Sequence, residues 1–543
     1  MQYNDYYWLN DDARTFLSRG YLNEPAEERI KQIARVAERY LLIEGFAEKF
    51  ERYMAKGYYS LATPVWINFG KEKGLPISCY GSWIDDSLDS MLSTAREIGM
   101  MSKYGGGTSA YLGNIRPRGS SITTGGKADG PIHYARLYDT VVDVCKQSEA
   151  RRGACAVYLP IEHDDIMEFL DIGSEGNPIQ NLQYGVTIGD QWLSEMKAGD
   201  PVKRKVWAKV IQRRSEFGYP YLLFRDNANK NTPYAELDYK ITASNLCSEI
   251  MLPTDSENSF VCCIGSINLL HWEEIEKTDA VEVYTQFLNA VMDEFITKAK
   301  NKPGLERAWK FAVKHRAIGV GVLGYHSFLQ SKLIPFESLQ AKQWNRSIFK
   351  TIKERTDSAS QKLYKLDPDN YECERPGFAN TTLVAIAPTK SSSFILGQVS
   401  MGIEPIKSNY FVKDLSKIKT VYKNPYLVEE LKKYDMDREE IWDSIMKKDG
   451  SVQHLDFPTK EVFKTFLEIS PKEIILQTAQ RQQYIDQSQS VNLMIHPTIP
   501  AKDINQLYLY AHGEGVKTLY YQYSQNSAQA FSRNILECVN CEA

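Results

Sequence analysis

A short polar segment, Asn245-Leu-Cys247-Ser-Glu249, combines three side chains that could do chemistry together. In an extended chain successive side chains alternate between two faces, so Asn245, Cys247 and Glu249 would line one face. A thiol, a carboxylate and an amide make a poor core stripe, but they supply a sulfur reactant, a general base and a hydrogen-bond donor. A polar surface edge with one incidental buried cysteine would give the same pattern, and these residues alone leave both interpretations open.

Two other places in the chain offer thiols for the same site. Cys79 lies far upstream, after Ser78, and Cys262 and Cys263 follow shortly after Glu249. Adjacent cysteines rarely form a disulfide with each other because the geometry is strained. We therefore expect at most one of this pair to face a site and the other to pack in the core.

The chain ends on a Cys-x-x-Cys pair, Cys538 and Cys541. Such a pair is either a redox couple or half of a zinc site. A zinc site needs four ligands, there is no second pair with this spacing, and His512 lies outside the usual ligand spacing. A dithiol near a chain terminus suits thiol–disulfide exchange, so we predict a redox pair and no metal.

Two further motifs are less specific. Tyr520 and Tyr521 are adjacent, which is typical of a packed aromatic strand, although tyrosine can also pass an electron and a proton as a neutral radical. The segment from Gly319 to Gly324 matches GxGxxG, but it follows a helical pattern and lacks the acidic residue expected of a dinucleotide site. We interpret these glycines as positions of tight backbone packing.

The bulk composition excludes several classes of protein. The chain has 543 residues and a formal net charge of −4, which gives no reason to expect nucleic-acid binding. Its first residues lack the basic and apolar regions of a secretory signal, and no run is apolar and long enough for a membrane helix. Nine cysteines in this length are not a secreted disulfide framework. We expect a cytoplasmic protein.

The elements that must position these residues follow from hydrophobic periodicity. Apolar residues at helical spacing predict helices over most of residues 11–60. Beyond them, short apolar runs at 153–161, 182–188, 220–224 and 381–388 alternate with helical patterns, which favours an α/β domain with largely parallel strands. We predict an N-terminal helical region over 1–60, one catalytic domain over 61–530 and a flexible tail over 531–543.

Together, NLCSE, CCIGSIN, the earlier Ser78-Cys79 pair, LYYQ and the C-terminal cysteine pair resemble the large subunit of class I ribonucleotide reductases. The resemblance runs from about residue 60 to the end, with the motifs in the family's order and approximate spacing. It implies a ten-stranded α/β barrel with Cys247 on a loop inside it. It also implies reduction of ribonucleotides, with diphosphates as the expected substrates, by thiyl-radical chemistry.

The resemblance assigns roles to these residues one by one. Cys247 resembles the thiyl-radical cysteine, Glu249 the base on the 3′-hydroxyl, and Asn245 a hydrogen-bond donor to the substrate. Cys79 and Cys262 resemble the dithiol that becomes a disulfide; Cys262 is preferred to its neighbour because of its six-residue offset to Asn268. The resemblance also identifies Tyr520 and Tyr521 as a radical relay. It identifies Cys538 and Cys541 as the pair that re-reduces the site.

Nucleotide contacts also follow from the resemblance. The expected substrate contacts are Thr63, Ser78, Thr389, Ser391, Ser392 and Ser393. The expected contacts of a deoxynucleotide effector are Asp86, Arg116, Gln147, Arg151 and Arg152, on or beside two loops over 116–130 and 147–153. Cys79 comes too early in the chain to leave room for the N-terminal ATP-cone domain of larger relatives, so we expect regulation by dNTP or ATP effectors at this specificity site.

The expected partners are a separate small subunit, a thioredoxin or glutaredoxin, the nucleotide substrate and a second copy of the chain. No cofactor is expected on this chain, because the radical would arise at a dinuclear metal site in the small subunit. Two alternatives remain. A cobalamin-dependent class II reductase would not need Tyr520 and Tyr521, and a non-catalytic nucleotide-binding or thiol-exchange protein would not need Asn245, Cys247 and Glu249 together.

Overall fold

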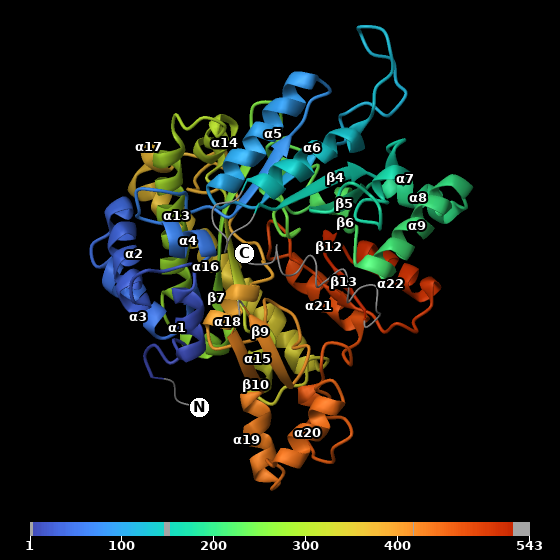
Figure 1. Cartoon of the computed structure of the whole chain (residues 1–543). Helices are drawn as coiled ribbons and strands as arrows, with labels where there is room; N and C mark the ends of the chain where they lie inside the picture. Colours follow the sequence, from blue (N-terminus) through green and yellow to red (C-terminus); the bar gives the residue numbers. More distant parts are fainter. Residues whose placement is uncertain (1–3, 146–152, 416–417, 525–543) are drawn as a thin grey trace.

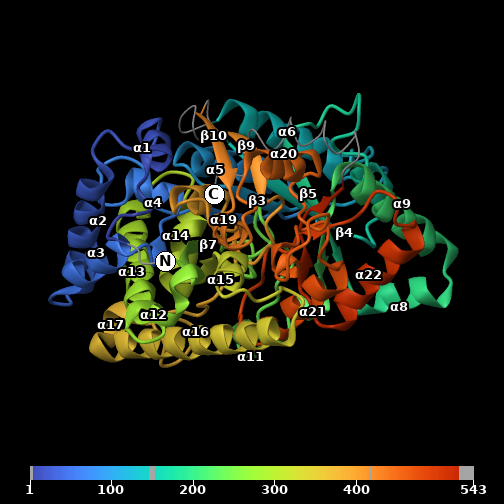
Figure 2. The same ribbon diagram turned by 90° about the horizontal axis from the view of Figure 1, so that it is seen from below.

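The N-terminal region is helical because its apolar residues recur on one side of each helix. In the computed structural model, which describes residues 4–145, 153–415 and 418–524, Ile30, Ile33 and Ala34 lie on the buried face of α2. The helices are α1 (Asp11–Ser18), α2 (Ala26–Leu41) and α3 (Phe46–Ala55), as predicted. Helices α2 and α3 pack against α13 (Ala280–Ala299), beside which they lie in Figures 1 and 2, and all three N-terminal helices share one hydrophobic core with the rest of the chain.

A curled sheet occupies the centre of the molecule (Figure 1). Its first half is parallel and runs in the order of the chain: β2 (Cys79–Trp83), β3 (Thr108–Tyr111), β4 (Cys155–Pro160), β5 (Leu182–Ile188) and β6 (Tyr221–Phe224). These strands are almost wholly buried, as is usual for parallel strands covered on both faces. The predicted strands at 153–161, 182–188 and 220–224 are confirmed.

The second half of the sheet meets the first half in antiparallel fashion at both edges. At one edge β7 (Phe260–Asn268) pairs with β2, and at the other β12 (Thr518–Leu519) pairs with β6. From β7 the sheet continues through β8 (Ile318–Leu323), and parallel bridges at Val384 and Gln489 carry it on. The remaining short strands are β1 (Tyr59–Ser60), β11 (Leu493–Met494) and β13 (Gln522–Tyr523).

The ring therefore closes with ten segments. Five belong to the first half, and the other five are β7, β8 and residues 383–386, 487–494 and 518–523. The amide of Tyr520 donates to the carbonyl of Val491 (2.8 Å), which joins the last two segments. The predicted ten-stranded α/β barrel is confirmed, although residues 381–388 make only isolated bridges. Gly319 and Gly321 lie on β8 itself, where an added Cβ would come within 2.9 Å of Ala385, so their role is close packing.

Helices surround the barrel. Figure 2 shows the long α16 running along one side of the molecule, with α21 and α22 near one of its ends. The bounds of the outer helices are α4 (Thr63–Asn68), α5 (Leu88–Lys103), α6 (Pro131–Val144), α7 (Ile166–Phe169), α8 (Asp190–Ala198), α9 (Pro201–Phe217), α10 (Arg225–Ala228), α11 (Pro233–Glu236), α12 (Trp272–Ile275), α14 (Glu306–His315), α15 (Tyr325–Ser331), α16 (Leu339–Leu366), α17 (Pro368–Tyr371), α18 (Lys390–Ile395), α21 (Pro471–Gln482) and α22 (Ala501–Gly513).

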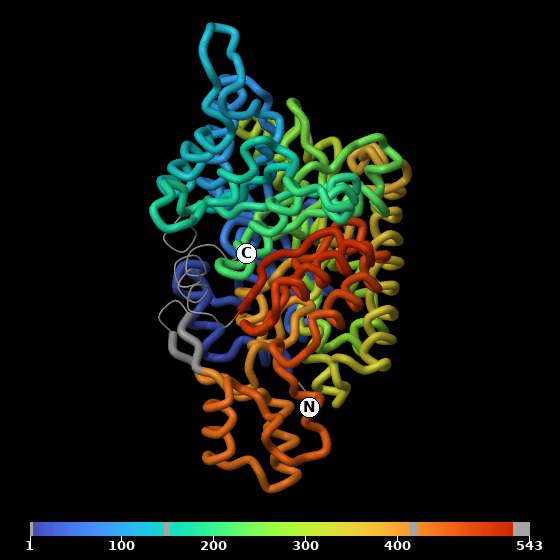
Figure 3. The backbone as a smooth tube through the Cα atoms, turned by 90° about the vertical axis from the view of Figure 1, so that its right-hand side faces the viewer, coloured from blue at the N-terminus to red at the C-terminus, as the bar shows by residue number. Residues whose placement is uncertain are grey.

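Two features project from this body in Figure 3. One is a hairpin within 116–130, in which the amide of Ala128 donates to the carbonyl of Ser120 (2.8 Å). The other is a lobe that follows the hairpin of β9 (Tyr410–Leu415) and β10 (Ile418–Lys423). It contains α19 (Pro425–Lys433) and α20 (Glu439–Lys447) and has a small hydrophobic core of its own. Across the residues described, no helix has both the length and the apolar character needed to cross a bilayer.

Candidate active site

The segment that carries Asn245, Cys247 and Glu249 is a turn, so the expectation of an extended chain was wrong. Asn245 Oδ1 accepts hydrogen bonds from the amides of Glu249 (3.1 Å) and Ile250 (3.2 Å), and Ser248 has a left-handed backbone with φ of 67°. The asparagine side chain thus replaces a strand partner and folds the chain back on itself. All three predicted side chains are nevertheless buried, which excludes the interpretation as a surface edge.

The barrel holds this loop, residues 245–251, by its backbone carbonyls. Tyr158 on β4 donates to the carbonyl of Asn245 (2.7 Å), and Thr518 on β12 donates to that of Ser248 (3.0 Å). Ser490 donates to the carbonyl of Cys247 (2.5 Å). Because these donors come from both halves of the barrel, Cys247 lies on a loop fixed inside it, as expected.

Cys79 and Cys262 lie directly opposite each other where the two halves of the barrel meet. They are register partners on β2 and β7. Opposite residues of an antiparallel pair have Cα atoms roughly 4.5–5.5 Å apart, within the range that a disulfide spans. Each thiol lies near an amide nitrogen, Asn245 Nδ2 for Cys79 (3.5 Å) and Gln487 Nε2 for Cys262 (3.6 Å).

The choice between the adjacent cysteines follows from strand alternation. Cys262 and Cys263 point to opposite faces of β7. Cys262 faces Cys79, whereas Cys263 lies near Tyr284 of α13, a phenol whose pKa is raised by burial and then by this thiol. The structure therefore brings Cys79, Cys262 and the 245–251 loop together and leaves Cys263 in the core, as predicted.

Burial controls the protonation of the site. Removal from water raises the pKa of Glu249 to about 7, and hydrogen bonds from its own backbone amide, Asn245 and Ser490 oppose this rise. Burial also raises the pKa of Cys262 well above its usual value, which keeps that thiol protonated at neutral pH. A carboxyl with a pKa near neutrality is well matched to general acid–base work.

Tyr520 and Tyr521 lie on the segment that begins with the loop's anchor, Thr518. Their ring centroids are 4.2 Å apart. Tyr520 is buried and Tyr521 is half-buried. The predicted pair is therefore in direct contact, and its backbone leads to the 245–251 loop.

The predicted substrate contacts lie at two helix starts and beside β2. Thr63 begins α4, and Ser78 precedes Cys79. Thr389 has a left-handed backbone with φ of 55°, and its hydroxyl accepts the amide of Gly402 (2.8 Å). Ser391 and Ser393 follow on α18, as does Ser392, and all three are buried. The hydroxyl of Ser391 has no hydrogen-bond partner among the described residues, which suits a group that binds a ligand.

The predicted effector contacts are only partly described. Asp86 accepts hydrogen bonds from the Arg116 side chain (2.6 Å) and amide (3.2 Å), at the base of the 116–130 hairpin. Gln147, Arg151 and Arg152 lie outside the described residues, as do Cys538 and Cys541.

Sequence reasoning missed several residues that shape the site. Gln487 contacts Cys262, Ser490 contacts both Cys247 and Glu249, and Tyr219 donates a hydrogen bond to Tyr521 (3.0 Å). The polar run QSQS at 487–490 inside an otherwise buried stretch was the available signal. Buried polar residues need partners, so such a run indicates a polar interior.

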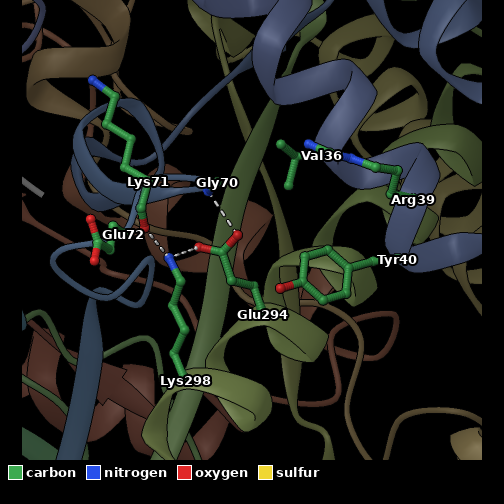
Figure 4. Close-up of a pocket in the computed structure, with 8 residues that line it drawn as sticks. All are labelled: Val36, Arg39, Tyr40, Gly70, Lys71, Glu72, Glu294 and Lys298. Carbon is green, nitrogen blue, oxygen red and sulfur yellow. Dashed lines mark hydrogen bonds and ion pairs between the residues drawn. The ribbon is translucent and has the colours of Figure 1, made fainter.

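A cavity of about 400 Å³ lies away from these residues, beside α2 and α13 (Figure 4). Glu294 there accepts hydrogen bonds from the Gly70 amide (2.7 Å) and Lys298 (2.7 Å), so its charge is balanced within the protein. The cavity is lined by Val36, Arg39, Tyr40, Gly70, Lys71, Glu72, Glu294 and Lys298. Within the described part of the chain, no cluster of His, Cys, Asp and Glu could hold a metal ion.

Comparisons with known proteins agree with this geometry. The family model of the ribonucleotide reductase barrel domain matches residues 77–203, 201–372 and 370–522. The ribonucleoside-diphosphate reductase large subunit of Invertebrate iridescent virus 3 is 31% identical over 590 residues, covering 93% of this chain and 92% of its own. The putative large subunit of Frog virus 3 is 32% identical over 500 residues, covering 88% and 87%.

A solved structure is closer in sequence than these viral proteins. The alpha subunit of the class Id ribonucleotide reductase of Actinobacillus ureae superposes with a TM-score of 0.91 and is 53% identical. The match covers 99% of this chain and all of that one.

Proposed function

The chain belongs to the ribonucleotide reductase family and is a large subunit of that enzyme, and we propose that it reduces ribonucleoside diphosphates with a radical supplied by a separate small subunit. One observation carries the assignment of the site: Cys79 and Cys262 are register partners in the barrel, and Asn245 links Cys79 to the loop that holds Cys247 and Glu249. The alternative of a non-catalytic protein gives no reason for a buried carboxylate beside three buried thiols.

The proposed chemistry balances within this group of side chains. The Cys247 thiyl radical takes the hydrogen atom from the ribose 3′-carbon and becomes a thiol, while Glu249 accepts the 3′-hydroxyl proton. Cys79 and Cys262 supply two electrons and two protons: one proton leaves with the 2′-hydroxyl as water, a hydrogen is added at the 2′-carbon, and the two sulfurs form a disulfide. Glu249 returns its proton to the 3′-oxygen, and the 3′-carbon takes a hydrogen atom back from Cys247, which restores the thiyl radical. Holding all the groups in one oriented complex is the protein's main contribution.

The substrate phosphates are proposed to bind at residues 389–393. The Ser391 hydroxyl, buried and without a hydrogen-bond partner among the described residues, can donate to a phosphate oxygen. Thr63, Ser78, Thr389, Ser392 and Ser393 are proposed to complete the contacts to the nucleotide.

The radical is proposed to arrive through Tyr521 and Tyr520, whose rings are in contact. The radical cofactor belongs to the small subunit, and this chain's part is to hold two phenols in line with the Cys247 loop. A class II enzyme would make its radical without such a relay, so the tyrosine pair favours class I.

Regulation and assembly are proposed at the end of the molecule where α5 and α6 lie (Figure 1). Asp86 and Arg116 are proposed to contact a deoxynucleotide or ATP effector, together with Gln147, Arg151 and Arg152. Leu88 and Leu92 on the outer side of α5 are 60% and 52% exposed. Exposed leucines one helical turn apart suit a homodimer interface, which we propose here.

Re-reduction of the site is proposed to pass through Cys538 and Cys541, with a thioredoxin or glutaredoxin as the external donor. A thiol-dependent reaction of this kind needs a reducing compartment, and we propose that the protein is cytoplasmic.

A reduction assay tests the proposal directly. The purified chain is incubated with a ribonucleoside diphosphate, a dithiol and an effector, in the presence or absence of candidate small subunits and of adenosylcobalamin. We expect deoxynucleotide only when a small subunit is present. Product with adenosylcobalamin alone would instead identify a class II enzyme, and no product under any condition would reject the catalytic assignment.

A further inference from the structure

A third tyrosine is attached to the proposed relay. The Tyr219 hydroxyl donates a hydrogen bond to the Tyr521 hydroxyl oxygen (3.0 Å), and the two ring centroids lie 5.1 Å apart, edge to face. Tyr219 is only 4% exposed. Water therefore competes little for this hydrogen bond, and the proton that Tyr219 donates has a defined acceptor.

The backbone fixes this contact from two directions. Gly218 ends α9 with φ of 86°, and a Cβ atom there would lie 2.9 Å from the carbonyl oxygen of Gln522. The Gln522 amide donates to the Gly218 carbonyl (3.2 Å). Arg214 donates to the carbonyls of Tyr520 (2.9 Å) and Pro220. The segments that carry Tyr219 and Tyr521 are thus joined on both sides of the contact.

A neighbouring tyrosine provides an internal comparison. The Tyr221 ring lies 4.7 Å from that of Tyr520 and 5.3 Å from that of Tyr521, so it is as close to the relay as Tyr219. Ring proximity allows an electron to move, but a neutral tyrosyl radical forms only if the phenol proton also moves. The hydrogen bond from Tyr219 to Tyr521 provides a path for the proton as well as for the electron.

We propose that Tyr219 is a third redox-active tyrosine that exchanges a hydrogen atom with Tyr521, a role that depends on the proposed relay through Tyr521 and Tyr520. In this step the O–H bond of Tyr219 breaks and an O–H bond forms on the Tyr521 phenoxyl oxygen. Tyr219 is oxidised by one electron and Tyr521 is reduced by one, and the proton follows the existing hydrogen bond. Tyr219 does not lie between Tyr521 and Tyr520, so a radical on Tyr219 is stored next to the relay and must return to Tyr521 before it can reach Tyr520.

The test places 3-aminotyrosine, which is oxidised more easily than tyrosine, at one position at a time. Three chains carry it in place of Tyr219, Tyr221 or Tyr521. Each is mixed with the small subunit, a ribonucleoside diphosphate and an effector, and the radical is recorded by electron paramagnetic resonance. We expect an aminotyrosyl signal at positions 521 and 219, and at least tenfold less at position 221.

The outcomes separate this inference from the proposed function. A signal at 521 with none at 219, or equal signals at 219 and 221, overturns the role of Tyr219 alone. No signal at 521 overturns the relay itself and this inference with it. Tyr521→Phe should reduce the aminotyrosyl signal at position 219 at least tenfold. If that signal persisted, position 219 would be oxidised by a route that bypasses Tyr521, and the inference would be overturned.

A second readout uses the chain with 3-aminotyrosine in place of Tyr521. Tyr219→Phe keeps the ring but removes the hydrogen-bond donor, so the g value of the radical at position 521 should shift. An unchanged spectrum would mean that Tyr219 does not contact the radical oxygen. Tyr221→Phe is the matched control and should leave the spectrum as it is.

Discussion

The 245–251 loop and the 389–393 segment, which begins helix α18, differ in how their polar groups are satisfied. The 245–251 loop is bonded to both halves of the barrel, because three of its carbonyls accept hydrogen bonds from the side chains of Tyr158, Ser490 and Thr518. In the 389–393 segment, by contrast, the buried Ser391 hydroxyl has no hydrogen-bond partner among the described residues. The loop is held by hydrogen bonds within the protein, whereas this hydroxyl is left for a ligand.

We interpret this difference as one between groups that are proposed to react and groups that are proposed to bind the substrate. A reacting thiol must stay within a few tenths of an ångström of its place, so its loop is held before the substrate arrives. A phosphate-binding hydroxyl gains its partner only in the complex, so it is left unsatisfied at a cost of about 1–3 kcal/mol. Substitutions in the 245–251 loop should therefore lower kcat, and substitutions in the 389–393 segment should raise KM.

The largest effect is expected from Cys247→Ser. The variant keeps the backbone carbonyl that Ser490 binds, so the loop should stay in place. It lacks the thiol that forms the radical, so deoxynucleotide formation should fall to background while the Kd for the nucleotide changes by about twofold at most. Product assays and calorimetric titration measure the two quantities. Normal turnover would remove Cys247 from the mechanism.

The next largest effect is expected from Glu249→Gln. Loss of a positioned general base typically lowers kcat by roughly 10²–10⁴-fold, and substrate binding should be little changed. In the unmodified chain, kcat/KM should rise with pH through about 7, because the free carboxylate must be ionised to act as the base. A profile with no ionisation near this pH would argue against Glu249 as the base.

Glu249→Gln should lower activity but raise the free energy of unfolding at neutral pH. Between pH 4.5 and about 7 the unfolded chain has released the Glu249 proton while the folded chain retains it. The free energy of unfolding therefore falls as pH rises through this range, by roughly 3 kcal/mol in full. Glu249→Gln removes this cost, so the variant should gain stability relative to the parent as pH rises to about 7. Denaturant unfolding at pH 5 and pH 8 measures the difference, and equal gains at both would contradict it.

The double variant Cys538→Ser, Cys541→Ser should separate chemistry from reductant supply. Cys79 and Cys262 already hold two electrons, so a prereduced chain should complete about one turnover with a thioredoxin-like donor and then stop. A small dithiol that diffuses into the barrel should restore part of the activity. If the double variant completed many turnovers with the protein donor, Cys538 and Cys541 would not be the redox pair, and a structural or metal-binding role would be favoured.

The smallest effect is expected from Ser391→Ala. Loss of one hydrogen bond to a charged phosphate, about 1.5 kcal/mol, should raise KM about tenfold and leave kcat unchanged. Stability should stay the same or rise slightly, because the removed hydroxyl has no partner among the described residues. Ser331→Ala is the control, since Ser331 is not among the proposed nucleotide contacts and its hydroxyl donates to the Phe328 carbonyl (2.7 Å). An equal rise in KM for both variants would contradict a specific role for Ser391.

Much of the fold and site could be predicted because the pattern of residues is local. The strands at 153–161, 182–188 and 220–224 follow from continuous apolar runs, and Cys79, Cys247 and Cys262 stand in recognisable motifs. The shape of the 245–251 loop could not be predicted from periodicity, because the Asn245 side chain bonds the backbone and competes with the extended conformation. The separate core of the 424–463 lobe was also missed, since no Gly- or Pro-rich linker marks it.

Contacts between distant segments were the least predictable. Tyr219 and Tyr521 are 302 residues apart, and they meet where β12 pairs with β6 and Gln522 bonds to Gly218. Nothing in the spacing of the Tyr219-Pro-Tyr221 motif shows which of its two tyrosines makes the hydroxyl contact.

We propose that the dithiol formed by Cys79 and Cys262 reduces the substrate beside Cys247. A single-turnover reaction tests this role, using the prereduced Cys538→Ser, Cys541→Ser chain with small subunit, ribonucleoside diphosphate and no added reductant. The product and the cysteine-containing peptides are quantified by mass spectrometry in the same sample. We predict about one deoxynucleotide per site and an equal amount of Cys79–Cys262 disulfide. Deoxynucleotide formed while both thiols remain reduced would contradict the account.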